Sequence, residues 1–136
     1  RDLHSFPTRR SSDLRTFTTA DVGYINTHGT ATVKGDIVES EAVREVFGKD
    51  AGNLVLNSTK AATGHMMGAG GVTEVISCIK ALETGLVAPT LNLENKDPDC
   101  DLNYVSELTK IDGLKYAMSN AFGFGGQNSS VIVGKY

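Results

Sequence analysis

The chain has 136 residues, about the size of one domain, and its 40% hydrophobic and 21% charged content excludes a disordered protein. Thirteen basic and sixteen acidic residues leave a formal net charge of −3, so nothing indicates a surface that binds nucleic acid through its phosphates. No apolar run approaches the roughly 18 residues that a membrane-spanning helix needs.

The first 14 residues differ from the rest of the chain. They show no helical or strand period, and although they are basic and rich in serine, their two aspartates argue against a transit peptide. The run from His4 to Leu14 resembles a translated sequencing-library adapter joined to a partial gene. We therefore expect residues 1–14 to be a non-native tail, with a natural flexible tail as the alternative, and residues 15–136 to form the domain.

The next segment alternates strand and helix signals. Residues 22–26 form a β-prone run that ends in a loop over 27–32. Asp36 and Glu39 fit a capping box at the start of a helix, and Gly48 is placed to end it in the left-handed conformation. Apolar residues at three- and four-residue spacing predict the buried face of this helix: Val38, Ala42, Val43, Val46 and Phe47.

A second strand is expected at 54–57, short and apolar as in a sheet that is covered on both faces. A long helix from Met66 to Glu83 follows. Its apolar stripe comprises Val72, Val75, Ile76, Ile79 and Leu82, which we interpret as core packing. Each glycine in a helix costs about 1 kcal/mol relative to alanine, so the four glycines near its start indicate close approach of another helix or of a ligand.

The C-terminal third is predicted to be irregular over 89–101 and to form strands at 102–105, 115–121 and 130–136. The last two strands flank a glycine-rich turn and can pair as antiparallel neighbours. The element order predicts an α/β fold, with a mixed sheet and helices on its faces.

Three loops carry the chemical signal. His28 and His65 each lie in a Gly/Thr loop after a predicted strand, and the loops of neighbouring parallel strands lie side by side, so the two rings can meet. Lys60 and Glu74 are, on sequence grounds, solvated surface residues unless the long helix is buried. The glycine-rich helix start gives only weak support to a nucleotide site, because no G-K-[ST] or GxGxxG pattern is present.

The cysteines and histidines show no metal-binding spacing, neither paired CxxC nor HExxH. Cys78 is interpreted as a small buried hydrophobe and a poor nucleophile. Together with Cys100 it makes no disulfide framework, and with no recognisable signal peptide this favours a reducing cytoplasm.

Taken together, the motifs resemble the β-ketoacyl-[acyl-carrier-protein] synthases, most closely the elongating synthase II type, over about residues 20–136. The residues that carry the resemblance are Asn26-Thr27-His28-Gly29-Thr30-Ala31-Thr32, Gly35-Asp36, Asn57-Ser58-Thr59-Lys60, Thr63-Gly64-His65 with Gly68-Ala69-Gly70-Gly71, and Asn120-Ala121-Phe122-Gly123-Phe124-Gly125-Gly126-Gln127-Asn128. The resemblance implies a thiolase-like fold, of which this chain is most of the C-terminal half, with a five-stranded mixed sheet between helices.

The resemblance also implies an activity, the decarboxylating condensation of malonyl-carrier protein with an acyl group held on a cysteine of the N-terminal half. It implies acyl carrier protein as partner, a homodimeric full-length enzyme in the cytoplasm, no membrane or nucleic-acid partner, and no cofactor beyond the phosphopantetheine arm. The implied roles are decarboxylation for His28 and His65, an active-site lysine for Lys60, support for Glu74, Asp36 and Glu39, phosphopantetheine binding for Thr30 and Thr32, and gating and oxyanion binding for Phe124 in the loop Gly123, Phe124, Gly125 and Gly126.

No nucleophile motif of the family is present, and neither cysteine lies in that context, so we expect the chain to be a fragment that cannot condense acyl chains alone. We also expect the glycine-rich helix to expose an apolar face that the other half covers in the complete fold. Two alternatives remain open: half of a polyketide or aryl-polyene ketosynthase, and a non-catalytic subunit similar to a chain-length factor. Retention of His28, Lys60 and His65 argues against the second.

Overall fold

A four-stranded mixed sheet forms the centre of residues 17–135, the part of the chain that the computed structural model describes. Its strand order is β2-β1-β5-β6, where the strands are β1 (Val22–Asn26), β2 (Val55–Asn57), β5 (Tyr116–Gly123) and β6 (Gln127–Gly134). β1 pairs in parallel with both β2 and β5, and β6 is antiparallel to β5. The predicted strands at 22–26 and 54–57 and the C-terminal hairpin are confirmed. The expected tail at 1–14 lies outside the described residues.

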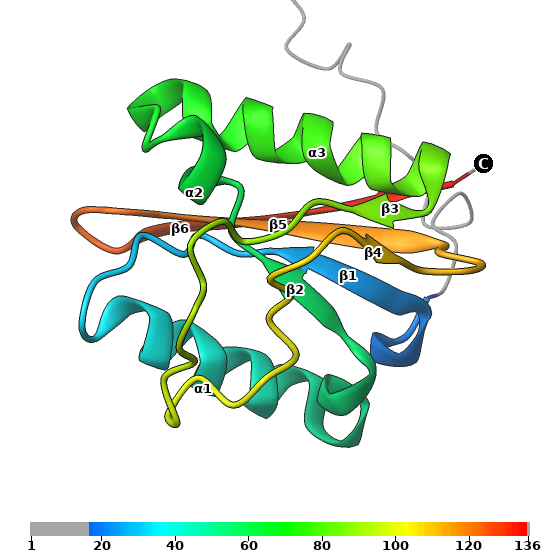
Figure 1. The fold of residues 1–136 in the computed structure, drawn as a ribbon, viewed down its shortest axis with the longest axis horizontal. Helices are drawn as coiled ribbons and strands as arrows, with labels where there is room; N and C mark the ends of the chain where they lie inside the picture. The colour runs from blue at the N-terminus through cyan, green and yellow to red at the C-terminus, as the bar shows by residue number, and fades with distance from the viewer. Residues whose placement is uncertain (1–16, 136) are drawn as a thin grey trace, which may run out of the picture.

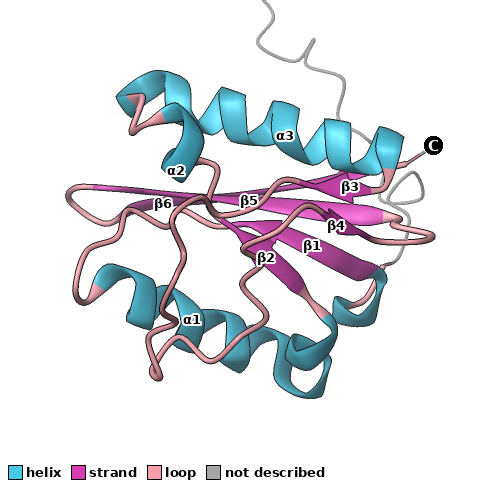
Figure 2. Cartoon of the chain, in the orientation of Figure 1, coloured by secondary structure: helices cyan, strands magenta, loops and turns pink. Residues whose placement is uncertain are grey.

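Helices cover both faces of this sheet. Helix α1 (Gly35–Phe47) lies on one face and helix α3 (Gly70–Thr84) on the other (Figures 1 and 2). Successive side chains of a strand point to opposite faces, so in β1 Ile25 joins the core on the α1 side and Tyr24 the core on the α3 side. The fold class predicted from the element order is confirmed. No helix in the described part of the chain is long and apolar enough to cross a membrane.

The sheet has four strands where five were expected. The predicted strand at 102–105 makes only an isolated bridge, between Tyr104 and Leu56. Two further short strands, β3 (Leu86–Val87) and β4 (Thr109–Lys110), form a separate antiparallel pair. The remaining short elements are η2 (Thr19–Asp21), η3 (Gly48–Asn53), α2 (Lys60–Thr63) and η4 (Met67–Ala69).

The capping box predicted for helix α1 is wrong. The helix begins at Gly35, after Lys34, so Asp36 lies within the first turn and no side chain caps the N-terminus. The helix does end at Gly48, whose φ is +52°, but its ψ of −122° lies outside the left-handed helical region. Of the predicted apolar face, only Val43 and Phe47 are buried. The other three residues, Val38, Ala42 and Val46, are exposed, because the buried face of α1 is shared with Glu39 and Ser40.

Helix α3 is shorter than predicted and faces the sheet differently. The expected helix from Met66 to Glu83 is split into η4 and α3. The residues against the sheet are mostly small or polar: Gly70, Glu74, Cys78, Ala81 and Leu82. The predicted core stripe is therefore wrong at Val72, Ile76 and Ile79, which are 66%, 52% and 40% exposed. The expectation that this helix presents an uncovered apolar face in this chain is confirmed.

Candidate active site

Three loops meet at the edge of the sheet where β1 and β2 end. They are the loop after β1, the segment after β2 with α2 and η4, and the turn between β5 and β6 (Figure 1). Together they line an open groove of about 510 Å³. Residues named from the sequence make up much of its wall: His28, Gly29, Thr30, Thr32, Asp36, Glu39, His65, Gly123 and Phe124.

The two histidines lie together, as the parallel pairing of β1 and β2 predicted. The ring centroids of His28 and His65 are 5.8 Å apart and the rings are nearly perpendicular, at 86°. Phe122 also packs near His28, with its ring centroid 5.4 Å from that of His28. Residues 37 positions apart in the chain are thus brought to one wall of the groove.

A buried ion pair lies next to His28. Lys60 is paired with Glu74, and their side chains are only 8% and 3% exposed, so the solvated surface positions considered for both are wrong. The Lys60 Nζ also lies 3.4 Å from Nδ1 of His28. Because an ammonium can only donate, Nδ1 of His28 accepts, and the ring proton lies on Nε2.

His65 has the same tautomer for a different reason. Its Nδ1 accepts a hydrogen bond from the backbone N–H of Met67, at 3.2 Å, which leaves the proton on Nε2. Burial, and then the charge of Lys60, lower the pKa of His28 below its ordinary 6.5, so this ring is neutral at pH 7. The site therefore offers two Nε2–H donors at one groove.

Glu39 holds the backbone of the His28 loop. Its carboxylate, 3% exposed, accepts hydrogen bonds from the N–H of His28 at 3.0 Å, from the N–H of Gly29 at 3.1 Å and from Nδ2 of Asn120 at 3.0 Å. Burial raises the pKa of Glu39, and these three hydrogen bonds partly offset the rise. Glu39 thus clamps the loop instead of capping its own helix.

Only glycine fits at position 29 of this loop. Its φ is +40°, and a Cβ there would lie 2.6 Å from the Cβ of Ser58. This close approach lets Ser58 Oγ donate to the carbonyl of Gly29 at 2.8 Å. The loops after β1 and β2 are therefore joined directly by a hydrogen bond.

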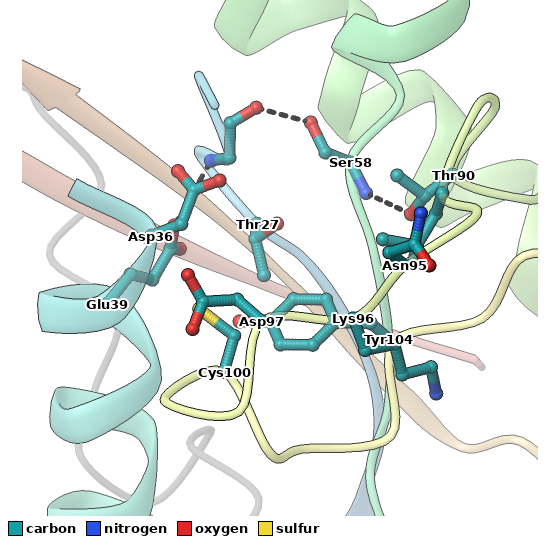
Figure 3. Close-up of a pocket in the computed structure, with 12 residues that line it drawn as sticks. Thr27, Asp36, Glu39, Ser58, Thr90, Asn95, Lys96, Asp97, Cys100 and Tyr104 are labelled. Atoms are coloured by element: carbon teal, nitrogen blue, oxygen red, sulfur yellow. Dashed lines mark hydrogen bonds between the residues drawn. The ribbon is translucent and has the colours of Figure 1, made fainter. Parts of the chain in front are cut away.

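Asp36 lies on the wall between the groove and a smaller cavity of about 160 Å³. Figure 3 shows that cavity between α1 and the irregular segment after β3, with Asp36 and Glu39 facing Cys100 and Tyr104. Burial raises the pKa of Asp36, against the lowering effect of the Ala31 and Thr30 amides. Asp36 lines the same groove as Thr30 and Thr32, whose Oγ1 atoms are 3.4 Å apart.

The turn between β5 and β6 projects Phe124 into solvent. Its side chain is fully exposed, and the next two residues, Gly125 and Gly126, have φ of +83° and +79°. Positive φ at consecutive positions favours glycine, which explains the glycine-rich sequence here. Cys78, by contrast, is buried, and burial raises the pKa of its thiol to about 12, in agreement with its interpretation as a poor nucleophile.

The structure brings into this network several residues for which the sequence predicted no role. Asn120 and Ser130 lie opposite one another in the β5–β6 hairpin and bond through their side chains. Phe122 packs on His28, and Ser58 holds Gly29. Asn120 and Phe122 stand at the end of a strand, before a glycine turn, and they and Ser58 lie in the motifs that resemble the family; these were the available signals.

Comparison with known proteins decides the family. The profile described as "Beta-ketoacyl synthase, C-terminal domain" matches residues 9–94. The chain belongs to the β-ketoacyl synthase family. The ketosynthase chain is 43% identical over 115 residues to 3-oxoacyl-[acyl-carrier-protein] synthase 2 of Synechocystis sp., an alignment that covers 85% of this chain and 28% of that protein. The chain therefore spans just over a quarter of that relative's length.

Solved ketosynthase structures share the fold. A β-ketoacyl synthase from Burkholderia phymatum superposes with a TM-score of 0.81 at 38% identity, over 88% of the present chain and 29% of the Burkholderia chain. A ketosynthase in complex with a type II polyketide synthase acyl carrier protein gives a TM-score of 0.79 at 36% identity, over 85% and 28%. The expected thiolase-like fold is confirmed, with a four-stranded sheet in place of the expected five strands.

Proposed function

We propose that this chain supplies the decarboxylating half of a condensing enzyme that elongates acyl chains on acyl carrier protein with malonyl-carrier protein, as in fatty acid biosynthesis. The observation that carries the proposal is the pair of neutral-tautomer Nε2–H donors of His28 and His65 at one groove. Two neighbouring N–H donors suit an oxygen on which negative charge develops.

In the proposed reaction, the bond between the malonyl carboxylate and the α-carbon breaks and CO2 leaves. The electron pair passes to the thioester, and its oxygen becomes an enolate oxyanion, which His28 and His65 stabilise by hydrogen bonds. The enolate carbon then attacks the carbonyl of an acyl group held as a thioester on a cysteine, and the thiolate of that cysteine departs. Both steps balance without a further cofactor.

The other assigned residues act around this centre. Lys60 donates toward Nδ1 of His28, so the ring proton of His28 stays on Nε2. Glu74 balances the charge of the lysine. We assign the phosphopantetheine arm to Thr30 and Thr32, which line the groove. The exposed Phe124 forms the gate, and its backbone N–H belongs to the oxyanion hole of the acyl thioester.

The nucleophilic cysteine lies, in this proposal, in another part of a longer protein. That part also covers the apolar face of α3, because an uncovered apolar helix face is unfavourable in water. Acyl carrier protein is the proposed partner, the complete enzyme is a homodimer, and the compartment is the cytoplasm. The acyl carrier protein bound to the ketosynthase neighbour supports the choice of partner.

A chimera tests the decarboxylation. In this hybrid, the full-length chimera, the present chain replaces the matching segment of the Synechocystis synthase. His28→Ala or His65→Ala should lower malonyl decarboxylation by about 10²–10³-fold, the usual effect of losing one oxyanion donor. Acylation of the cysteine should continue, and Met66→Leu, next to His65, serves as the control. Decarboxylation at the parent rate in either histidine variant would refute the assignment.

A polyketide or aryl-polyene ketosynthase is the second candidate, favoured by the 36% identity to a polyketide ketosynthase structure. It uses the same decarboxylation, so the acyl substrate separates the two. Elongation of saturated acyl-carrier protein by the complete enzyme that contains this chain supports the fatty acid assignment. Elongation of poly-β-keto chains alone would support the polyketide one. A non-catalytic subunit would elongate neither kind of chain.

A further inference from the structure

A chain of hydrogen bonds runs from the edge strand β6 to the His28 loop. Register pairs Ser130 with Asn120, and Ser130 Oγ donates to Asn120 Oδ1 at 2.8 Å. Asn120 Nδ2 then donates to Oε1 of Glu39 at 3.0 Å. The same Oε1 accepts the N–H of His28, and Oε2 accepts that of Gly29.

The orientation of the Asn120 amide decides whether this chain of bonds works. With Nδ2 toward Glu39 the amide donates to the carboxylate, whereas a flipped amide would place Oδ1 against a carboxylate oxygen. The Glu39 carboxylate, which can only accept, fixes the first orientation, and the Ser130 hydroxyl completes it by donating to Oδ1. Asn120 and Glu39 are each 3% exposed, so water is a poor substitute for either partner.

We propose that Ser130 is a positioning residue, which acts through Asn120 and Glu39 to fix the backbone that carries His28. Its effect on catalysis rests on the proposed function, but its effect on the loop does not. The same hairpin carries the turn with Phe124, so this relay also ties the turn to the histidine loop. Neighbouring Ser129 points to the opposite face of the strand and offers a matched control.

Amide hydrogen exchange on the full-length chimera tests the relay without reference to activity. Ser130→Ala should speed exchange at the N–H of His28 and Gly29 about fivefold, the weakening expected for one lost hydrogen bond. The rate of Ile25 in the central strand β1 is measured alongside, so a rise confined to His28 and Gly29 is distinguished from a general loss of stability, which would speed exchange at Ile25. Ser130→Thr, which keeps the hydroxyl, and Ser129→Ala should both retain the parent rates.

The catalytic consequence is measured in the full-length chimera. Ser130→Ala should lower kcat for malonyl decarboxylation about fivefold with an unchanged KM, and Ser130→Thr should restore it. Unchanged exchange at His28 and Gly29 in Ser130→Ala, or an equal change in Ser129→Ala, would overturn the relay. If the exchange responds but the parent chimera never decarboxylates malonyl substrate, the relay stands and the proposed function fails.

Discussion

The uncovered face of α3 should make this chain self-associate. Fully burying an aliphatic side chain contributes about 1.5–3 kcal/mol, and Val72, Ile76 and Ile79 have roughly half of their surface still to bury, so covering the face is worth about 3 kcal/mol per chain. A symmetric dimer covers two such faces and gains about 6 kcal/mol, which exceeds the association cost of at least about 4 kcal/mol by too little for a tight dimer. We therefore expect weak, concentration-dependent association and poor folding of the isolated chain.

Sedimentation velocity over a range of concentrations measures this directly. Ile76→Lys combined with Ile79→Glu should make the chain monomeric, while Val46→Lys on α1, also exposed, should leave association unchanged. In the full-length chimera the effects should reverse: the α3 variants place charges in a covered interface and abolish activity, and Val46→Lys does not. A parent chain that stays monomeric and unfolds in one sharp, reversible thermal transition would refute the reasoning.

Three further predictions concern the groove. Lys60→Met should destabilise the full-length chimera by about 3–5 kcal/mol, because it leaves the buried Glu74 carboxylate unpaired, and adding Glu74→Leu should restore most of the loss in thermal melts. Burial raises the pKa of Glu39, so the folded state keeps this proton to higher pH than the unfolded state. The free energy of unfolding should therefore fall as pH rises from 4.5 through the raised pKa, and Glu39→Gln should remove that slope in denaturant titrations. Phe124→Ala should change chain transfer or acyl preference more than thermal stability, since the ring is fully exposed; parent turnover and preference in this variant would remove the gate.

The meeting of the histidines could be predicted because it depends on local signals. Two short apolar runs, each followed by a Gly/Thr loop, indicate neighbouring parallel strands, and such strands deliver their loops to one edge of the sheet. The proximity of His28 and His65 follows from that arrangement alone. The roles assigned to them rest on the resemblance to the family and stay predictions.

The orientation of α3 could not be predicted from periodicity. An apolar stripe has the same spacing whether it meets its own sheet or another part of a larger protein. Here the small residues Cys78 and Ala81 let the helix lie close to the sheet, and the larger residues Ile76 and Ile79 point outward. The size of the side chains on each face of the helix, and not the apolar stripe, indicates which face lies against the sheet.

Glu39 shows how a local pattern is overridden by distant partners. A carboxylate three residues after Asp36 fits a capping box, but helix α1 begins one residue before Asp36. The N–H groups of His28 and Gly29 and the amide of Asn120, 81 positions away, claim the carboxylate instead. The sequence around Glu39 does not predict hydrogen-bond partners so far along the chain.

The burial of Lys60 and Glu74 has a consequence for ionic strength. Salt screens exposed charges, so surface pairs such as Lys80–Glu83, with both side chains more than half exposed, weaken as salt is added. The pair next to His28 is shielded from dissolved ions and keeps its strength. A response of the proposed reaction to added electrolyte is therefore expected to arise at the outer surface, where the proposed carrier protein would first contact this one.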